Sequence, residues 1–222
     1  MEVTPGIELT RTAAWTAVTF DRPRPVLSSA PVGGGDGWAR RVVNLWVDGP
    51  AAADQCADPA AAFARLCGAQ GWSGATVGLM TGVSPDRLAL VRLALHADAW
   101  TVLATAGIRN AHRAGEPVPA PAAAGTINVI AITGQGLTAA ARAEAIALAA
   151  EAKASILADL GVVSATGHAP ATGTGTDATA IICSDRGDTP YTGHHTDSGV
   201  ELACAVRTAI ARSLALEPAR RR

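Results

Sequence analysis

Residues 171–177 combine three hydroxyl side chains, two glycines and a carboxylate, a set of groups suited to binding a ligand or doing chemistry. They read Ala-Thr-Gly-Thr-Gly-Thr-Asp and lead directly into a predicted strand at residues 178–183. Glycine lets the backbone approach a ligand and expose its N–H groups, and threonine adds hydroxyl donors and acceptors. We therefore predict that Thr172, Thr174 and Thr176 bind substrate and that the Asp177 carboxylate is catalytic. An exposed polar loop would have the same composition, and because a strand follows the tract, a dinucleotide fingerprint is excluded.

Lys153 is the only lysine among 18 basic residues, the other 17 being arginine. It falls near the middle of the apolar stripe of a helix predicted from Thr138 to Leu160. A lysine at such a position must extend its ammonium to water or find a buried partner, because an unpaired buried charge is costly. If it does not reach water, we expect it to pair with Asp177 or to stabilise an oxyanion on the substrate.

Two adjacent histidines, His194 and His195, precede a second predicted helix, which begins near a Ser198/Glu201 capping box. Histidine takes up and releases protons near neutral pH, so His195 is a candidate catalytic residue, although simple exposure of the pair would look the same. A zinc site built from His194, His195 and Asp177 is a further alternative, but no His-x-x-x-His or Cys/His spacing supports it. We predict no metal ligands.

Glycines and amide side chains recur beside the ends of the predicted strands. A lone asparagine there is usually a turn former, but the repetition favours a ligand site rich in hydrogen bonds and poor in charge. The remaining predicted substrate-binding residues are Gly33, Gly34, Asn110, Thr126 and Asn128.

The predicted elements favour one α+β domain over residues 1–222, with a mixed or antiparallel sheet covered by helices and loose termini at 1–12 and 216–222. Strands are expected at 16–20, 26–29, 42–47, 75–80 and 129–133, and a hairpin at 88–106 turns at Ala97-Asp98. Asp58 followed by Pro59 predicts the start of a helix that ends at Gly68 or Gly71.

The composition narrows the class of protein. The net charge is −1 and charged residues make up 17%, so no basic surface for nucleic acid is expected. The apolar runs are too short to span a membrane, no signal peptide is recognisable, and the four cysteines lack disulfide or metal spacing. These features predict a cytoplasmic protein, and they are compatible with a homo-oligomer.

Several of these segments, taken in order, resemble the adenosylcobinamide amidohydrolase family of corrinoid salvage. The resemblance extends from residue 27 to about residue 210 and is carried by the co-occurrence of short motifs. These are Leu27-Ser-Ser-Ala-Pro31, Val77-Gly-Leu-Met-Thr81, Thr105-Ala-Gly-Ile-Arg-Asn-Ala111, Ala114-Gly115, Gly125-Thr-Ile-Asn-Val-Ile130, Glu151-Ala-Lys-Ala154, Ala171–Asp177 and Tyr191–Glu201.

The resemblance implies hydrolysis of the amide that joins aminopropanol to a propionate side chain of the corrin ring, giving adenosylcobyric acid. Cobalt would belong to the corrinoid substrate, and no cofactor is required. Asp177 and His195 would then form an acid–base pair, because amide hydrolysis needs an activated water and a proton for the departing amine. His194 replaces an expected small residue, so His195 is the position carried over. A non-catalytic corrinoid-binding module, or an unrelated amidase or peptidase with a Thr/Ser nucleophile from Thr172–Thr176, stays open.

Overall fold

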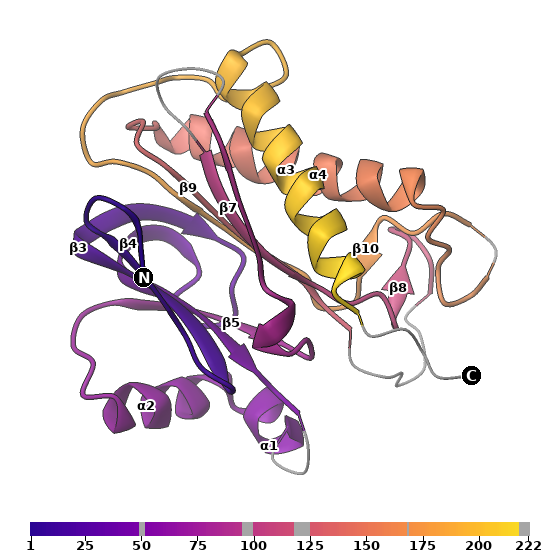
Figure 1. Cartoon of the computed structure of the whole chain (residues 1–222), viewed down its shortest axis with the longest axis horizontal. Helices are drawn as coiled ribbons and strands as arrows, with labels where there is room; N and C mark the ends of the chain where they lie inside the picture. Colours follow the sequence, from indigo (N-terminus) through magenta and orange to yellow (C-terminus); the bar gives the residue numbers. More distant parts are fainter. Residues whose placement is uncertain (49–51, 95–99, 118–124, 168, 218–222) are drawn as a thin grey trace.

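The computed structural model describes the chain except residues 49–51, 95–99, 118–124, 168 and 218–222. Its centre is a mixed nine-stranded sheet in which the long strand β3 pairs with β4 along one edge and with both β2 and β11 along the other. The helices lie on two sides, α3 and α4 together and α1 and α2 opposite (Figure 1). The predicted α+β class is therefore confirmed.

The strands are β1 (Glu2–Thr4), β2 (Ile7–Arg11), β3 (Trp15–Ser28), β4 (Gly35–Trp46), β5 (Thr76–Thr81), β6 (Ala89–Leu93), β7 (Trp100–Ala106), β9 (Ile127–Thr133) and β11 (Ala178–Ile182). A separate two-stranded sheet consists of β8 (Ala111–His112) and β10 (Gly173–Thr174). The helices are α1 (Ala52–Ala57), α2 (Pro59–Ala69), η1 (Pro85–Arg87), α3 (Ala139–Asp159) and α4 (Asp197–Ala215).

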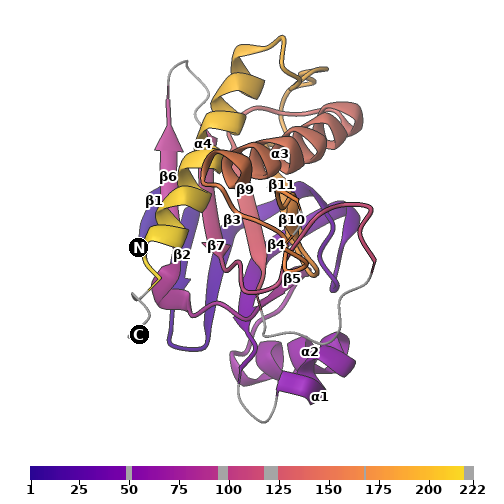
Figure 2. The same ribbon diagram turned by 90° about the vertical axis from the view of Figure 1, so that its right-hand side faces the viewer.

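The sheet is strongly curled, so that strands distant in its order share one core. Leu79 of β5, Leu103 of β7 and Ile130 of β9 belong to the same buried cluster. The outer face of β7 and β9 packs on α3 and α4, which lie side by side in Figure 2, through residues such as Leu148 and Leu202. Apolar burial thus fixes α3 against the strands whose ends carry the polar residues.

The helix starts follow from local capping chemistry. Thr138 accepts a hydrogen bond from the Ala141 N–H at the start of α3, and Asp58 does the same for α2, as predicted. For α4 the predicted capping residue was wrong. Thr196 caps the helix, while the Ser198 hydroxyl accepts a hydrogen bond from the Trp100 indole N–H.

Long-range pairing changes other sequence predictions. Residues 1–12 are not a loose terminus, because β1 and β2 add to the sheet and Ile7 is buried. The two strands predicted at 16–20 and 26–29 are one strand, β3, with an irregularity between Thr19 and Arg24. The predicted pairing of β6 with β7 is observed, whereas the Ala97-Asp98 turn and the terminus from residue 218 lie outside the described residues.

Candidate functional site

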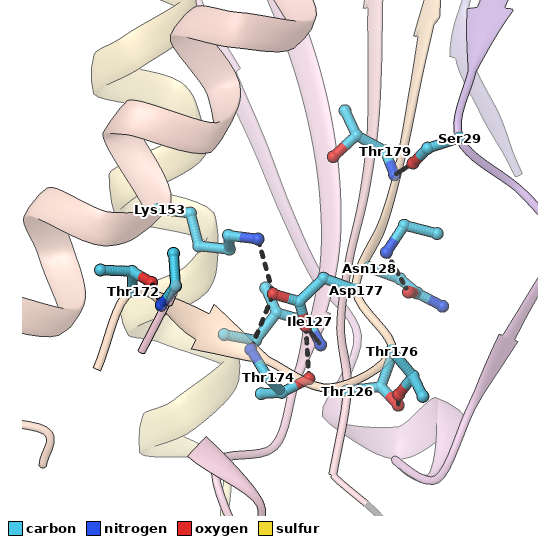
Figure 3. A network of polar contacts seen from close by, with 12 residues as sticks. Ser29, Thr126, Ile127, Asn128, Lys153, Thr172, Thr174, Thr176, Asp177 and Thr179 are labelled. Atoms are coloured by element: carbon cyan, nitrogen blue, oxygen red, sulfur yellow. Dashed lines mark hydrogen bonds and ion pairs between the residues drawn. The ribbon is translucent and has the colours of Figure 1, made fainter. Parts of the chain in front are cut away.

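The Asp177 carboxylate is the centre of a dense polar network (Figure 3). Oδ1 accepts hydrogen bonds from the Ile127 N–H at 2.9 Å and the Thr174 hydroxyl at 2.5 Å. Oδ2 accepts from the Thr174 N–H at 2.9 Å and the Lys153 ammonium at 2.5 Å. Four donors occupy the four acceptor positions of a carboxylate. Asp177 is therefore a fixed anion whose position is set by two strands and a helix.

Lys153 reaches this network from α3, as Figure 3 shows. Its side chain is 16% exposed and that of Asp177 is 10% exposed, so the ion pair is largely removed from water. Of the alternatives open to Lys153 from the sequence, the structure shows the pairing with Asp177. Among the described residues, Asp177 is the only group within hydrogen-bond distance of the ammonium. Two of its three N–H groups thus stay available to a ligand.

The absence of a side chain at Gly173 leaves room for the Lys153–Asp177 ion pair next to the Thr/Gly tract. A Cβ atom at this position would lie 2.5 Å from Asp177 Oδ2 and 3.1 Å from Lys153 Nζ. Any side chain would therefore displace the charged pair. Gly173 also pairs with His112 in the short β8–β10 sheet, which ties the tract to a second segment of the chain.

An open cavity of about 510 Å³ lies over the ion pair. Its volume is within the range of small-molecule sites. One wall is formed by α3 and the others by the β8 segment and the Thr/Gly tract. The residues that line it are His112, Ala114, Ala150, Glu151, Lys153, Ala154, Thr172, Gly173, Thr174, Gly175 and Asp177. A second hollow, of about 390 Å³, lies over β2 and β3 and contains none of the predicted site residues.

The predicted threonines are held by the protein itself. The Thr172 hydroxyl accepts a hydrogen bond from the Ala114 N–H, and the Thr126 and Thr176 hydroxyls are 3.0 Å apart. Thr172 and Thr174 line the cavity, whereas Thr126 and Thr176 do not. Their binding of substrate stays a prediction.

The predicted asparagines and glycines have different surroundings. Asn128 is 1% exposed, and its amide donates to Asn44 Oδ1 and the Met80 carbonyl and accepts from the Ala178 N–H. It therefore joins strands across the curled sheet and does not line the cavity. Asn110 is half-buried, with an amide oxygen that has no partner among the described residues. A Cβ at Gly33 or Gly34 would meet backbone oxygens at 2.5 and 2.2 Å, so both glycines are needed by the turn between β3 and β4.

The two histidines lie apart from Asp177. His195 is exposed and contacts the Tyr191 ring, with 5.5 Å between centroids. His194 Nε2 lies 2.6 Å from Oε2 of Glu151, at the edge of the cavity. Among the described residues, neither histidine is within hydrogen-bond distance of Asp177. The described part of the chain also contains no group of three His, Cys, Asp or Glu side chains placed to hold a metal ion.

His112 and Glu116 were missed by the sequence analysis. His112 lines the cavity, and its Nδ1 lies 3.6 Å from Glu116 Oε2. Partial burial alone would raise the pKa of Glu116, but hydrogen bonds from Ser164, Thr166 and the Arg113 N–H, together with the nearby His112, lower that pKa overall. The one signal in the sequence was the spacing of four residues between a histidine and a carboxylate.

The sequence profile of the adenosylcobinamide amidohydrolase family, CbiZ, matches residues 1–222, which is the whole chain. The chain belongs to this family. The resemblance inferred from the ordered motifs is thereby confirmed, and the family is one of amidohydrolases.

No curated protein matches the chain. Among solved structures, the PH0078 protein from Pyrococcus horikoshii OT3 is 13% identical, with 94% of this chain and 79% of that chain covered and a TM-score of 0.48. Within the described residues, no helix of this family member is both long and apolar enough to cross a membrane.

Proposed function

We propose that this protein hydrolyses the amide bond between aminopropanol and the corrin-ring propionate of adenosylcobinamide, and that adenosylcobyric acid is the product. Membership of the amidohydrolase family supports the reaction class. The observation that carries the site is the Lys153–Asp177 ion pair at the floor of a 510 Å³ cavity. Cobalt enters only as part of the corrinoid substrate.

Lys153 is suited to stabilise the oxyanion that forms when water adds to the amide carbon. Its ammonium is held at 2.5 Å by a carboxylate that four donors keep in place, so the positive charge needs little reorganisation during the reaction. A fixed donor in a partly dry site is worth about 10²–10³ in kcat when it contacts the oxyanion. In this proposal Asp177 holds and orients Lys153, because its own acceptor positions are already used.

The shape of the cavity fits one arm of the substrate better than the whole molecule. Adenosylcobinamide is larger than the 510 Å³ space, so the cavity would receive the aminopropanol amide and the corrin ring would lie against its rim. Ala150, Ala154 and Ala114 line the cavity beside the ion pair, and their small side chains leave room for the substrate. Amide and hydroxyl groups of the tract suit the carboxamide side chains of such a ring.

The direct test is incubation of the purified protein with adenosylcobinamide, followed by mass spectrometry for free aminopropanol and adenosylcobyric acid. Release of both products supports the proposal. Binding of the coloured corrinoid without release would instead assign the chain as a non-catalytic binding module. A covalent mass increase at residues 172–176 would assign a threonine nucleophile. Loss of activity with a chelator and recovery with zinc would replace the metal-free mechanism.

A further inference from the structure

His112 is the only histidine that lines the cavity in the described part of the chain. Its two ring nitrogens have different environments. Nδ1 is fully buried, has no hydrogen-bond partner in the strict sense, and faces Glu116 Oε2 at 3.6 Å. Because Nδ1 is buried against Glu116 while His112 lines the cavity, Nε2 is the ring nitrogen left to reach a ligand there. The His112 side chain is 17% exposed, so it is accessible but shielded.

Glu116 is held in place by several donors. Its Oε1 accepts hydrogen bonds from the Ser164 and Thr166 hydroxyls, each at 3.0 Å, and Oε2 accepts from the Arg113 N–H at 3.3 Å. Ser164 is 3% exposed, so one of these donors comes from the interior. The Ser164 and Thr166 hydroxyls donate to the Glu116 carboxylate and not to the His112 imidazole. Ser164 is therefore not activated as a nucleophile, because a serine nucleophile gives its proton to a histidine.

The position of His112 is set by the same short sheet that carries the ion pair's loop. Gly173, where a Cβ would contact both members of the Lys153–Asp177 pair, is the register partner of His112. The His112 carbonyl accepts a hydrogen bond from the Thr172 N–H at 2.9 Å, and the Thr172 hydroxyl accepts from the Ala114 N–H at 2.9 Å. The pairing of β8 with β10 therefore brings His112 to the cavity that Lys153 and Asp177 also line.

We propose that His112 is the general acid–base residue of this cavity and that Glu116 is its positioning residue. This inference rests on the proposed amide hydrolysis. With its proton on Nδ1, directed at Glu116, the imidazole offers a free electron pair at Nε2. The carboxylate also stabilises the imidazolium that forms when Nε2 takes up a second proton. A separation of 3.6 Å is compatible with this role, since catalytic hydrogen bonds are often long before substrate binds.

The proposed step balances in atoms and charge. The oxygen of a water molecule forms a bond to the amide carbon while Nε2 of His112 accepts one water proton, and Lys153 stabilises the oxyanion. When the tetrahedral intermediate collapses, the C–N bond breaks with its electron pair on nitrogen, and Nε2 returns the proton to that nitrogen. The products are the carboxylic acid and aminopropanol, which exchange a proton in solution. His112 ends in its starting form.

The first experiment tests the geometry without any substrate. Long-range ¹H–¹⁵N spectra of the full chain distinguish the Nδ1–H and Nε2–H tautomers of a histidine. We expect His112 to be the Nδ1–H tautomer at neutral pH and to lose that preference in Glu116→Gln. The charged groups around the cavity, Lys153 and Glu151 on α3 and Asp177 before β11, are unchanged in this variant. An Nε2–H tautomer in the wild-type protein would overturn the proposal.

The second experiment measures kcat and KM with adenosylcobinamide for His112→Gln, Glu116→Gln and His195→Gln. We expect His112→Gln to lower kcat by about 10²-fold or more with KM nearly unchanged, as for a general acid–base residue. Glu116→Gln should lower kcat less than His112→Gln does, because the imidazole stays in place and loses only the carboxylate that positions it. Wild-type kcat in His112→Gln would refute the role of His112 even if the wild-type enzyme is active. Absence of product from the wild-type enzyme would refute the proposed function, and the tautomer measurement would still decide the geometry.

Discussion

Substitution of Gly173 by alanine is the sharpest test of the ion pair, because it adds one methyl group and removes no polar group. The new Cβ would lie 2.5 Å from Asp177 Oδ2 and 3.1 Å from Lys153 Nζ. Non-bonded heavy atoms prefer about 3.5–4.0 Å, so the carboxylate must move by roughly 1 Å or the loop must lift by that amount. Either change separates Asp177 from Lys153 or from the Thr174 N–H.

A displacement of roughly 1 Å at a catalytic group can lower the rate by about 10²-fold. We therefore expect Gly173→Ala to lower kcat for aminopropanol release by about 10²-fold. Crowding at a packed position costs about 1–3 kcal/mol, so the free energy of unfolding should fall by that amount and the protein should stay folded. Rates are measured by mass spectrometry and unfolding by urea titration.

Gly175→Ala is the matched control in the same tract. The nearest atom to a Cβ at Gly175 is Asn110 Nδ2 at 3.9 Å, an ordinary contact, so the ion pair should persist and kcat should stay close to that of the wild type. Wild-type kcat in Gly173→Ala would refute the role assigned to the ion pair. Equal losses in both variants would point to the flexibility of the tract as the cause and would refute the steric argument.

Three further predictions concern neighbouring groups. Lys153→Met should lower kcat by about 10²-fold while corrinoid binding is retained, whereas a large fall in melting temperature at unchanged kcat would make the ion pair purely structural. Asn128→Leu should lower the free energy of unfolding by about 2–4 kcal/mol in urea titrations, because buried partners such as Asn44 lose their hydrogen bonds, and Asn110→Leu should cost less. Since the pKa of Glu116 is lowered in the folded state, its contribution to stability is present at neutral pH and is lost as the pH falls through that lowered pKa. The difference in melting temperature between the wild type and Glu116→Gln should accordingly shrink on acidification.

Features set by local chemistry were predictable from the sequence. Thr138 and Asp58 start helices because their side chains accept backbone N–H groups three residues later, and this depends on nothing distant. Pairing of Lys153 with Asp177 was one of the outcomes open to a single lysine within an apolar stripe, the other two being extension of the ammonium to water and stabilisation of an oxyanion.

Features set by distant pairing were not predictable. His112 belongs to a two-residue strand whose partner, Gly173, is far along the chain, and two residues carry no periodic signal. Asn128 was expected in a ligand site because glycines and amide side chains recur beside the ends of the predicted strands. The curl of the sheet instead brings Asn128 against Asn44 of β4 inside the core, where Asn128 donates to Asn44 Oδ1 and the Asn44 amide donates to the Thr105 hydroxyl.

The meeting of Lys153 and Asp177 itself follows from the crossover that connects two parallel strands. β9 and β11 are parallel, with Ala178 opposite Asn128, so Asp177 lies beside the start of β9 and accepts the Ile127 N–H. The chain leaves the other end of β9 and returns along α3. From Ala139 to Lys153 the helix rises about 21 Å, and β9 from Thr133 back to Ile127 is about 20 Å long. The helix position level with the Asp177 carboxylate is therefore the one occupied by the single lysine, and a shift of two residues would turn it to another face of α3.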